Sequence, residues 1–162
     1  MSCIVADAGP LIALAKAGLL ELPRRAFGQA LISRTVFDEC LAQARSHDAQ
    51  RIREAVDAGV LVVCDAPDWP VGRPVPRLDP GELSAIALAL HHSAPLLMDE
   101  KRGRRSAAHM GIPLVGVCGL LVIARRQRWI SNVHDVLTAM KRDGYYIAPS
   151  LVHKVLQLAG EE

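Results

Sequence analysis

A short apolar strand, an aspartate and an apolar helix follow one another directly at the start of the chain. Residues Cys3 to Ala6 favour a β-strand, Asp7 ends this run, and Gly9-Pro10 opens an apolar helix that ends near Gly18. Strands that alternate with helices form parallel sheets, and ligands bind beyond the carboxyl ends of such strands. The opening segment therefore predicts an α/β fold with Asp7 at the edge of the sheet where ligands bind.

The rest of the chain continues this alternation. The pattern predicts further strands at residues 30–32, 60–63, 96–98 and 112–115, helices between them, and two final helices over 132–142 and 149–159. Prolines crowd residues 65–77, so this segment is predicted to be a long loop. By its length, the chain is predicted to form a single domain, residues 1–162, with the C-terminal helices of residues 132–159 packed as an extension.

Composition excludes several classes of protein. The net charge of +2 is too mild to indicate a wide phosphate-binding face, although it does not exclude nucleic acid. The four cysteines form no CxxC pair, which argues against a zinc site and a disulfide framework. The N-terminus lacks the features of a signal peptide, and the longest apolar stretch, residues 115–124, is too short to span a membrane. A cytoplasmic protein without membrane contact is predicted.

Four carboxylates occupy positions that favour chemistry. Asp7 and Asp99 each end a predicted strand, Glu82 lies in the first turn of the helix before the second of these strands, and Glu39 lies early in another helix. If the two strands are neighbours, the four acids converge at one edge of the sheet. Clustered carboxylates need a cation to stay ionised, and hard oxygen ligands select Mg²⁺ or Mn²⁺. Such ions support hydrolysis of phosphodiesters, so the constellation indicates a nuclease.

Each acid also has a structural explanation. The run from Asp79 to Glu82 is a plain helix start, with Asp79 as N-cap and Glu82 reaching back in a capping box. Asp7 could cap a turn, and Glu39 could be solvated helix surface. Periodicity does not decide whether Glu39 or its neighbour Asp38 faces a site.

Four basic residues follow Asp99 within one short segment. They would lie beside any phosphate bound at this edge of the sheet, and a solvated basic helix face is the competing explanation. The candidate nucleic-acid-binding residues are Lys101, Arg102, Arg104 and Arg105.

The motifs together resemble those of the PIN-domain ribonucleases, in particular a prokaryotic PIN-like subgroup close to the toxins of VapBC toxin–antitoxin pairs. The resemblance covers nearly the whole chain. It is carried by Ile4 to Lys16, Val36 to Glu39, Leu78 to Glu82 with Ala85 to Ala89, Leu97 to Ala108, Gly111, Gly116, Gly119 to Leu121, Asp143 to Ile147 and Leu158 to Glu161.

This resemblance implies a fold, a site and an activity. The fold would be an α/β/α sandwich with a five-stranded parallel sheet of order 3-2-1-4-5, which places the strands ending at Asp7 and Asp99 side by side. The metal-binding acids of the family map onto Asp7, Glu39, Glu82 and Asp99. The activity would be cleavage of RNA with Mg²⁺ or Mn²⁺, by a homodimer that a small antitoxin protein holds silent.

The chain departs from the family pattern at two places. Ala8, Gly9 and Met98 stand where many relatives carry hydroxyl residues, so hydroxyl support for the metal site is missing. Glu100 follows Asp99 directly and could take its place as the last acid. A catalytically silent module that binds RNA or protein is therefore the rival hypothesis. A Rossmann-type nucleotide-binding protein is disfavoured because no G-x-G-x-x-G follows the first strand.

Overall fold

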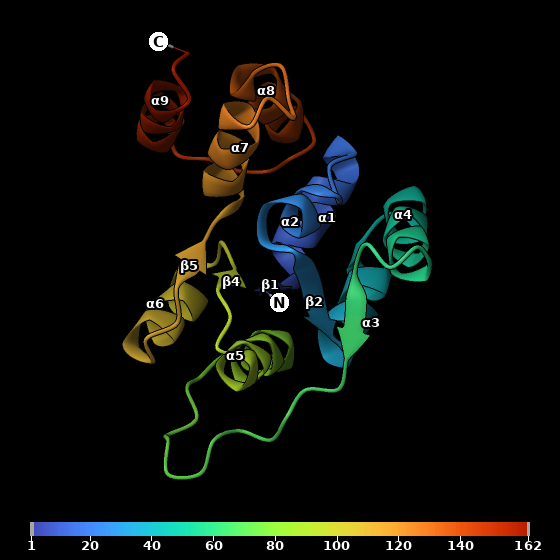
Figure 1. Cartoon of the computed structure of the whole chain (residues 1–162), viewed down its shortest axis with the longest axis vertical. Coiled ribbons are helices and arrows are strands. Elements are labelled where there is room, and N and C mark those ends of the chain that lie inside the picture. The colour runs from blue at the N-terminus through green and yellow to red at the C-terminus, as the bar shows by residue number, and fades with distance from the viewer. Residues whose placement is uncertain (1, 162) are drawn as a thin grey trace.

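The computed structural model describes residues 2–161 and contains a parallel sheet that helices cover on both faces (Figure 1). Within these residues the sheet has five strands in the order β3-β2-β1-β4-β5. The predicted α/β fold class and the strand order 3-2-1-4-5 are confirmed. The strands are β1 (Cys3–Ala6), β2 (Gln29–Ser33), β3 (Val62–Cys64), β4 (Leu96–Leu97) and β5 (Leu114–Val115).

Helices connect the strands and form the outer layers. The connecting helices are α1 (Ala8–Ala17), α2 (Leu22–Phe27), α3 (Arg34–Gln43), α4 (Ser46–Asp57), α5 (Pro80–His92) and α6 (Lys101–His109), and α7 (Val117–Arg126) follows the last strand. In Figure 1, α1, α2 and α7 lie on one side of the sheet and α5 and α6 on the other. The core is mainly aliphatic, because fully buried leucines and isoleucines fill the space between sheet and helices.

The centre of the sheet is the pair β1 and β4. Val5 lies opposite Leu96 and Ala6 lies opposite Leu97, and the backbone N–H of Asp7 donates to the carbonyl of Leu97 at 3.0 Å. In parallel sheets, opposite residues point their side chains to the same face, and successive residues alternate between faces. The two strands therefore place Asp7 and the end of β4 next to each other.

Two strands begin two residues later than the sequence pattern predicts: β5, predicted at residues 112–115, and β3. The predicted strand at residues 60–63 is found at Val62–Cys64, because Val60 and Leu61 form the turn that closes α4. Their backbone N–H groups both donate to the carbonyl of Ala55, and Gly59 supplies the positive φ of 76° that this ending requires. The two residues are buried as expected but belong to a helix cap.

Residues 65–79 form the long loop that the prolines predict. Figure 1 shows it leaving β3, extending past α5 and returning to the start of that helix. Trp69 packs against the core, and its indole N–H donates to the carbonyl of Arg73 at 3.1 Å. The loop is thus anchored by its one aromatic side chain.

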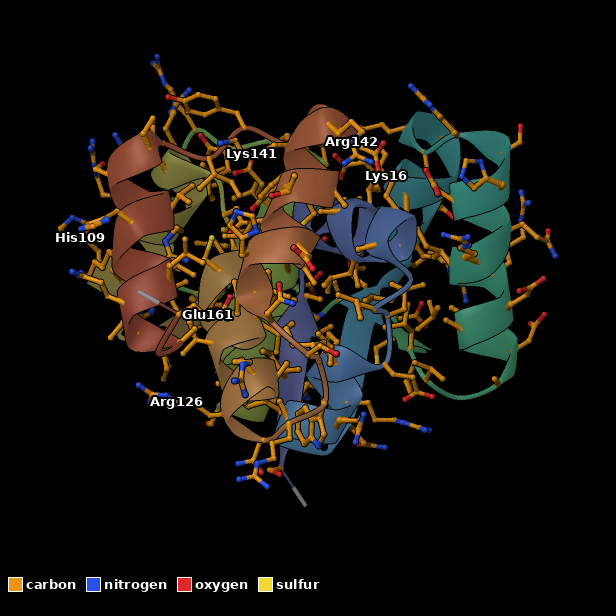
Figure 2. All side chains as sticks on the ribbon, turned by 90° about the horizontal axis from the view of Figure 1, so that it is seen from above. Lys16, His109, Arg126, Lys141, Arg142 and Glu161 are labelled. Carbon is orange, nitrogen blue, oxygen red and sulfur yellow. The ribbon has the colours of Figure 1, made fainter. Side chains whose placement is uncertain are left out.

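The C-terminal helices α8 (Val133–Arg142) and α9 (Pro149–Leu158) pack against α7, and α8 also contacts α1. Glu161, labelled in Figure 2, caps α8: its carboxylate accepts from the backbone N–H of Val133 at 2.6 Å and of His134 at 3.0 Å. The assignment of residues 1–162 to a single domain stays a prediction. No helix within residues 2–161 is long and apolar enough to cross a membrane.

We expect Glu161→Ala to lower the free energy of unfolding by about 1–2 kcal/mol, because two N–H groups at the start of α8 lose a charged acceptor. Urea denaturation followed by circular dichroism measures this change. The matched control is Glu54→Ala, since Glu54 is exposed and its carboxylate accepts from the exposed side chain of Gln50 in the same helix. It should change stability by less than about 0.5 kcal/mol. Equal effects of the two substitutions would contradict the capping role.

Candidate metal centre

Asp7 follows the last residue of the central strand and does not use its carboxylate to cap the helix that comes next. It is the N-cap residue of α1 by position, but its side chain makes no capping hydrogen bond. Only 7% of the residue is exposed. The alternative that Asp7 merely caps the following turn is therefore not what this structure contains.

Burial and neighbouring acids raise the pKa of the Asp7 carboxyl. Burial raises the pKa of Asp7 to about 6, the backbone N–H of Ala8 opposes the rise, and the charges of Glu39, Asp79 and Glu100 add to it. Loss of solvation and nearby negative charges both disfavour the ionised form of Asp7. Asp7 thus lies within the electrostatic reach of three other acids.

Glu82 begins α5 in the capping box that the sequence pattern allows. Asp79 accepts from the backbone N–H of Glu82 at 2.8 Å, and the Oε1 atom of Glu82 accepts from the backbone N–H of Asp79 at 3.4 Å. The second carboxylate oxygen, Oε2, is buried and has no hydrogen-bond partner among residues 2–161. The capping box therefore uses half of the Glu82 carboxylate and leaves the other half free.

Two glycines allow the acids to approach the backbone. A Cβ atom on Gly103, in the first turn of α6, would lie 2.7 Å from Oε2 of Glu82 and 2.5 Å from the sulfur of Met98. A Cβ atom on Gly81 would collide with the carboxylate of Glu39. Side chains at these two positions would push the carboxylates out of their present places.

The pKa values of Glu82 and Glu100 shift in opposite directions. Burial raises the pKa of Glu82 to about 8, with further contributions from Asp79 and from Glu100. Burial also acts on Glu100, but the backbone N–H groups of Gly103 and Arg102 outweigh it and lower the pKa of this carboxyl. Glu100 caps α6 by accepting from the N–H of Gly103 at 2.8 Å. The proton of the pair consequently resides on Glu82.

Glu39, and not its neighbour Asp38, is the acid of α3 that faces the cluster. Asp38 is exposed, whereas Glu39 is half-buried and lies against Gly81 at the start of α5. Burial and the charge of Asp79 raise the pKa of Glu39, and a hydrogen bond from Gln43 partly offsets this rise. The structure thus separates two residues between which periodicity could not choose.

Asp99 does not join the other acids. Its Oδ1 atom accepts from the backbone N–H of Val117 at 3.0 Å, and its Oδ2 atom accepts from the hydroxyl of Tyr145 at 2.5 Å. Continuing the register of β1 and β4 sets Asp7 opposite Met98, so Asp99 points to the other face, toward α7. Of the four acids proposed from the sequence, the structure brings together Asp7, Glu39 and Glu82, and Glu100 completes this cluster.

Tyr145 is a residue of this region to which the sequence analysis gave no role. It lies between α8 and α9, 46 residues from Asp99 in the chain. Burial raises the pKa of its hydroxyl, as do the charge of Asp99 and the hydrogen bond to it. The only signal in the sequence was its place in Asp143-Gly144-Tyr145-Tyr146, one of the motifs shared with relatives.

The basic residues of α6 divide into two kinds. Lys101, Arg102 and Arg105 are exposed, as contact with a phosphate backbone requires. Arg104 is half-buried, and its guanidinium donates to the carbonyl of Met98 at 2.6 Å. Arg104 therefore holds the end of β4, beside Asp99, and is the member of the predicted set that points inward.

A hollow of about 690 Å³ opens beside Glu82 and Glu100. Its walls are Arg77, Leu78, Asp79, Glu82, Glu100 and Arg102. The guanidinium of Arg102 donates to the carbonyl of Arg77 at 3.0 Å, which joins the start of α6 to the end of the long loop. The hollow is thus lined by three carboxylates and two arginines.

The acids suit a hard divalent cation in kind. All are oxygen donors, and the orphaned Oε2 of Glu82 together with the raised pKa values of Asp7 and Glu82 shows that ionised carboxylates are disfavoured here unless a cation compensates them. Within residues 2–161, however, no group of three or more Asp, Glu, His or Cys side chains stands close enough to hold an ion. Coordination by this cluster would require its carboxylates to draw together.

The comparison with protein families agrees with the fold. A family model described as a PIN domain matches residues 3–161 of the chain. A comparison with curated proteins found no match. The family model spans nearly every residue, including β1, the acidic cluster and the C-terminal helices. The chain therefore belongs to the PIN-domain family.

Proposed function

We propose that this protein is an endoribonuclease that depends on Mg²⁺ or Mn²⁺. PIN domains are generally nucleases and typically bind these ions. The observation that carries the proposal is the orphaned, buried Oε2 of Glu82, which faces Gly103 beside the Glu100 carboxylate and shares a hollow with two arginines. A buried carboxylate that lacks a partner is costly unless a cation or proton neutralises it.

The acids of the cluster have two tasks in this proposal. Asp7, Glu82 and Glu100 would hold the metal, and Glu39 would orient the attacking water. A bound divalent ion supplies an activated water and stabilises the leaving oxygen of the phosphodiester. Asp99, for which metal binding was predicted from the sequence, is assigned instead to positioning, because its carboxylate is held on the α7 side of the sheet by the N–H of Val117 and the hydroxyl of Tyr145.

The exposed cations would bind the RNA backbone. Lys101, Arg102 and Arg105 lie on α6, which Glu100 caps, and Arg77 lines the same hollow as Arg102. Phosphate contacts of this kind position a nucleic acid without reading its sequence. We further propose that the protein acts as a homodimer and as the toxin-like member of a pair with a small antitoxin protein.

A catalytically silent module that binds RNA or protein is the second candidate function. The observation that favours it is Met98, which is fully buried with its sulfur near Gly103 and supplies no hydroxyl to the cluster. Ala8 and Gly9 likewise carry no hydroxyl next to Asp7. Binding of RNA that survives removal of metal, with no cleavage under any condition, would favour this function.

We expect the purified protein to cleave mixed RNA with Mn²⁺ and to lose this activity in EDTA. Asp7→Asn should lower the cleavage rate about 100-fold or more, because it removes a charged ligand. Asp57→Asn, at an exposed aspartate of α4, is the matched control and should cleave as the natural protein does. Cleavage that persists in EDTA or in Asp7→Asn would disprove the catalytic assignment.

Glu100→Gln and Asp99→Asn should have different effects. The first should weaken Mn²⁺ binding and slow cleavage, because it neutralises an acid of the cluster. The second should mainly lower the free energy of unfolding, by about 1–2 kcal/mol, because it weakens the bonds to Val117 and Tyr145. Tyr145→Phe should match Asp99→Asn in this loss. If Asp99→Asn abolished Mn²⁺ binding and Glu100→Gln did not, Asp99 would be the ligand.

The thermal stability of the metal-free protein should fall as the pH rises from about 4 to about 8. The carboxyls of Asp7 and Glu82 have ordinary pKa values of 3.8 and 4.5, and in the folded protein these rise to about 6 and about 8. The folded state therefore binds more protons than the unfolded state in this range, and the stability this provides is lost as the pH passes the folded pKa values.

Scanning calorimetry at several pH values measures this fall, and two variations test its origin. Glu82→Gln does not titrate at residue 82 and should flatten the dependence above pH 6. Mn²⁺ should stabilise the protein more at pH 8 than at pH 5, because it competes with the protons of the cluster. A free energy of unfolding that rises between pH 5 and pH 8 without metal would contradict the raised pKa values of Asp7 and Glu82.

A further inference from the structure

A second hollow, of about 310 Å³, lies between the long loop and α6. Its walls are Arg73, Pro74, Pro76, Ser106, His109 and Met110. None of these residues belongs to the acidic cluster, and none of the six is a carboxylate. The hollow combines apolar surface from two prolines and a methionine with three groups that form hydrogen bonds.

Contacts within the loop and with α6 fix the outer wall of this hollow. The carbonyl of Arg73 accepts from the indole of the inward-packed Trp69, and the carbonyl of Arg77 accepts from Arg102. Between these two points Pro74 and Pro76 restrict the backbone, since the pyrrolidine ring fixes φ. The wall is thus ordered before any ligand binds.

The two hollows follow each other along one face of α6. Arg102 borders the acidic hollow, Ser106 borders the second, and Met110 closes it. Residues four apart lie on the same side of a helix, about 6 Å from one another along its axis. One or two nucleotides of a single strand span this spacing, so a strand with a phosphate over the acids would place a neighbouring base at the second hollow.

The charges around the second hollow favour a polyanion. Arg73 is part of its wall, and Lys101, Arg102 and Arg105 are exposed on the helix beside it. Proteins that bind single strands without sequence preference stack the bases on flat side chains, next to cations that contact the phosphate backbone. Pro74, Pro76 and the imidazole of His109 supply such surfaces, and Ser106 and Arg73 can bond to the edge of a base.

We propose that this second hollow is a base-binding subsite for single-stranded RNA, next to the proposed centre of cleavage. The proposal rests on the proposed function, since it assigns RNA as the substrate. It adds that the protein holds an unpaired base beside the cleaved phosphate, between the long loop and the end of α6.

Binding of a short fluorescent single-stranded RNA, measured by anisotropy in EDTA at low salt, tests the subsite without cleavage. His109→Ala should raise the Kd about five-fold, as expected for the loss of one stacking contact. Ser106→Phe, which fills the hollow, should raise it at least as much. His92→Ala is the matched control, because His92 is also exposed in the last turn of its helix.

An RNA of the same length that lacks its bases separates base binding from phosphate binding. It should bind His109→Ala and the natural protein equally well. Three results would each overturn the subsite: unchanged affinity in both variants, equal losses for His109→Ala and His92→Ala, or no binding by the natural protein. Unchanged affinity in both variants would favour a protein partner for the hollow. The proposed function is tested separately, by cleavage with Mn²⁺. Base-dependent binding without cleavage would support the subsite and contradict the proposed nuclease activity.

Discussion

The pairing of β1 with β4 is the constraint on which the rest of the site depends. The bond from the Asp7 N–H to the carbonyl of Leu97 joins two strands that are about 90 residues apart in the chain, and it sets which side chains share a face. Because side chains alternate along a strand, this register sends Met98 to the side of Asp7 and Asp99 to the side of α7. Glu100, at the first turn of the next helix, comes back to the side of the acids. A shift of one residue would exchange the positions of the two neighbouring acids.

The same arrangement accounts for the electrostatics of the cluster. Glu82 lies in a capping box that satisfies one of its oxygens, and Glu100 is held ionised by the N–H groups at the start of α6. The buried partner then retains the proton, because two carboxylates this close do not both ionise without a cation. Structural roles and a metal site are thus compatible in these residues: the caps fix the carboxylates, and the free oxygen of Glu82 remains for a ligand.

The C-terminal helices are tied to the end of the sheet and not only to its outer surface. Tyr145 reaches Asp99 from the connection between α8 and α9, and Glu161 closes the start of α8. Arg104 holds the carbonyl of Met98 on the same edge. Together these contacts fix the backbone that carries Glu100. The match of the PIN-domain family model over residues 3–161 includes these helices, which agrees with their part in supporting the edge.

By itself, the sequence determined the alternation of strands and helices, the long proline-rich loop, the acids Asp7 and Glu82 and the basic helix after Asp99, because these features depend on local periodicity, backbone restriction and caps. The strand order came from the resemblance to a family. The same resemblance selected Glu39 over Asp38, and the structure sets Glu39 against Gly81. Only the tertiary structure decided that Arg104 points inward, and that Glu100 lies with the acids while Asp99 bonds to Tyr145. These choices depend on strand register and on packing between distant segments, and a difference of one residue reverses the face without changing the local pattern.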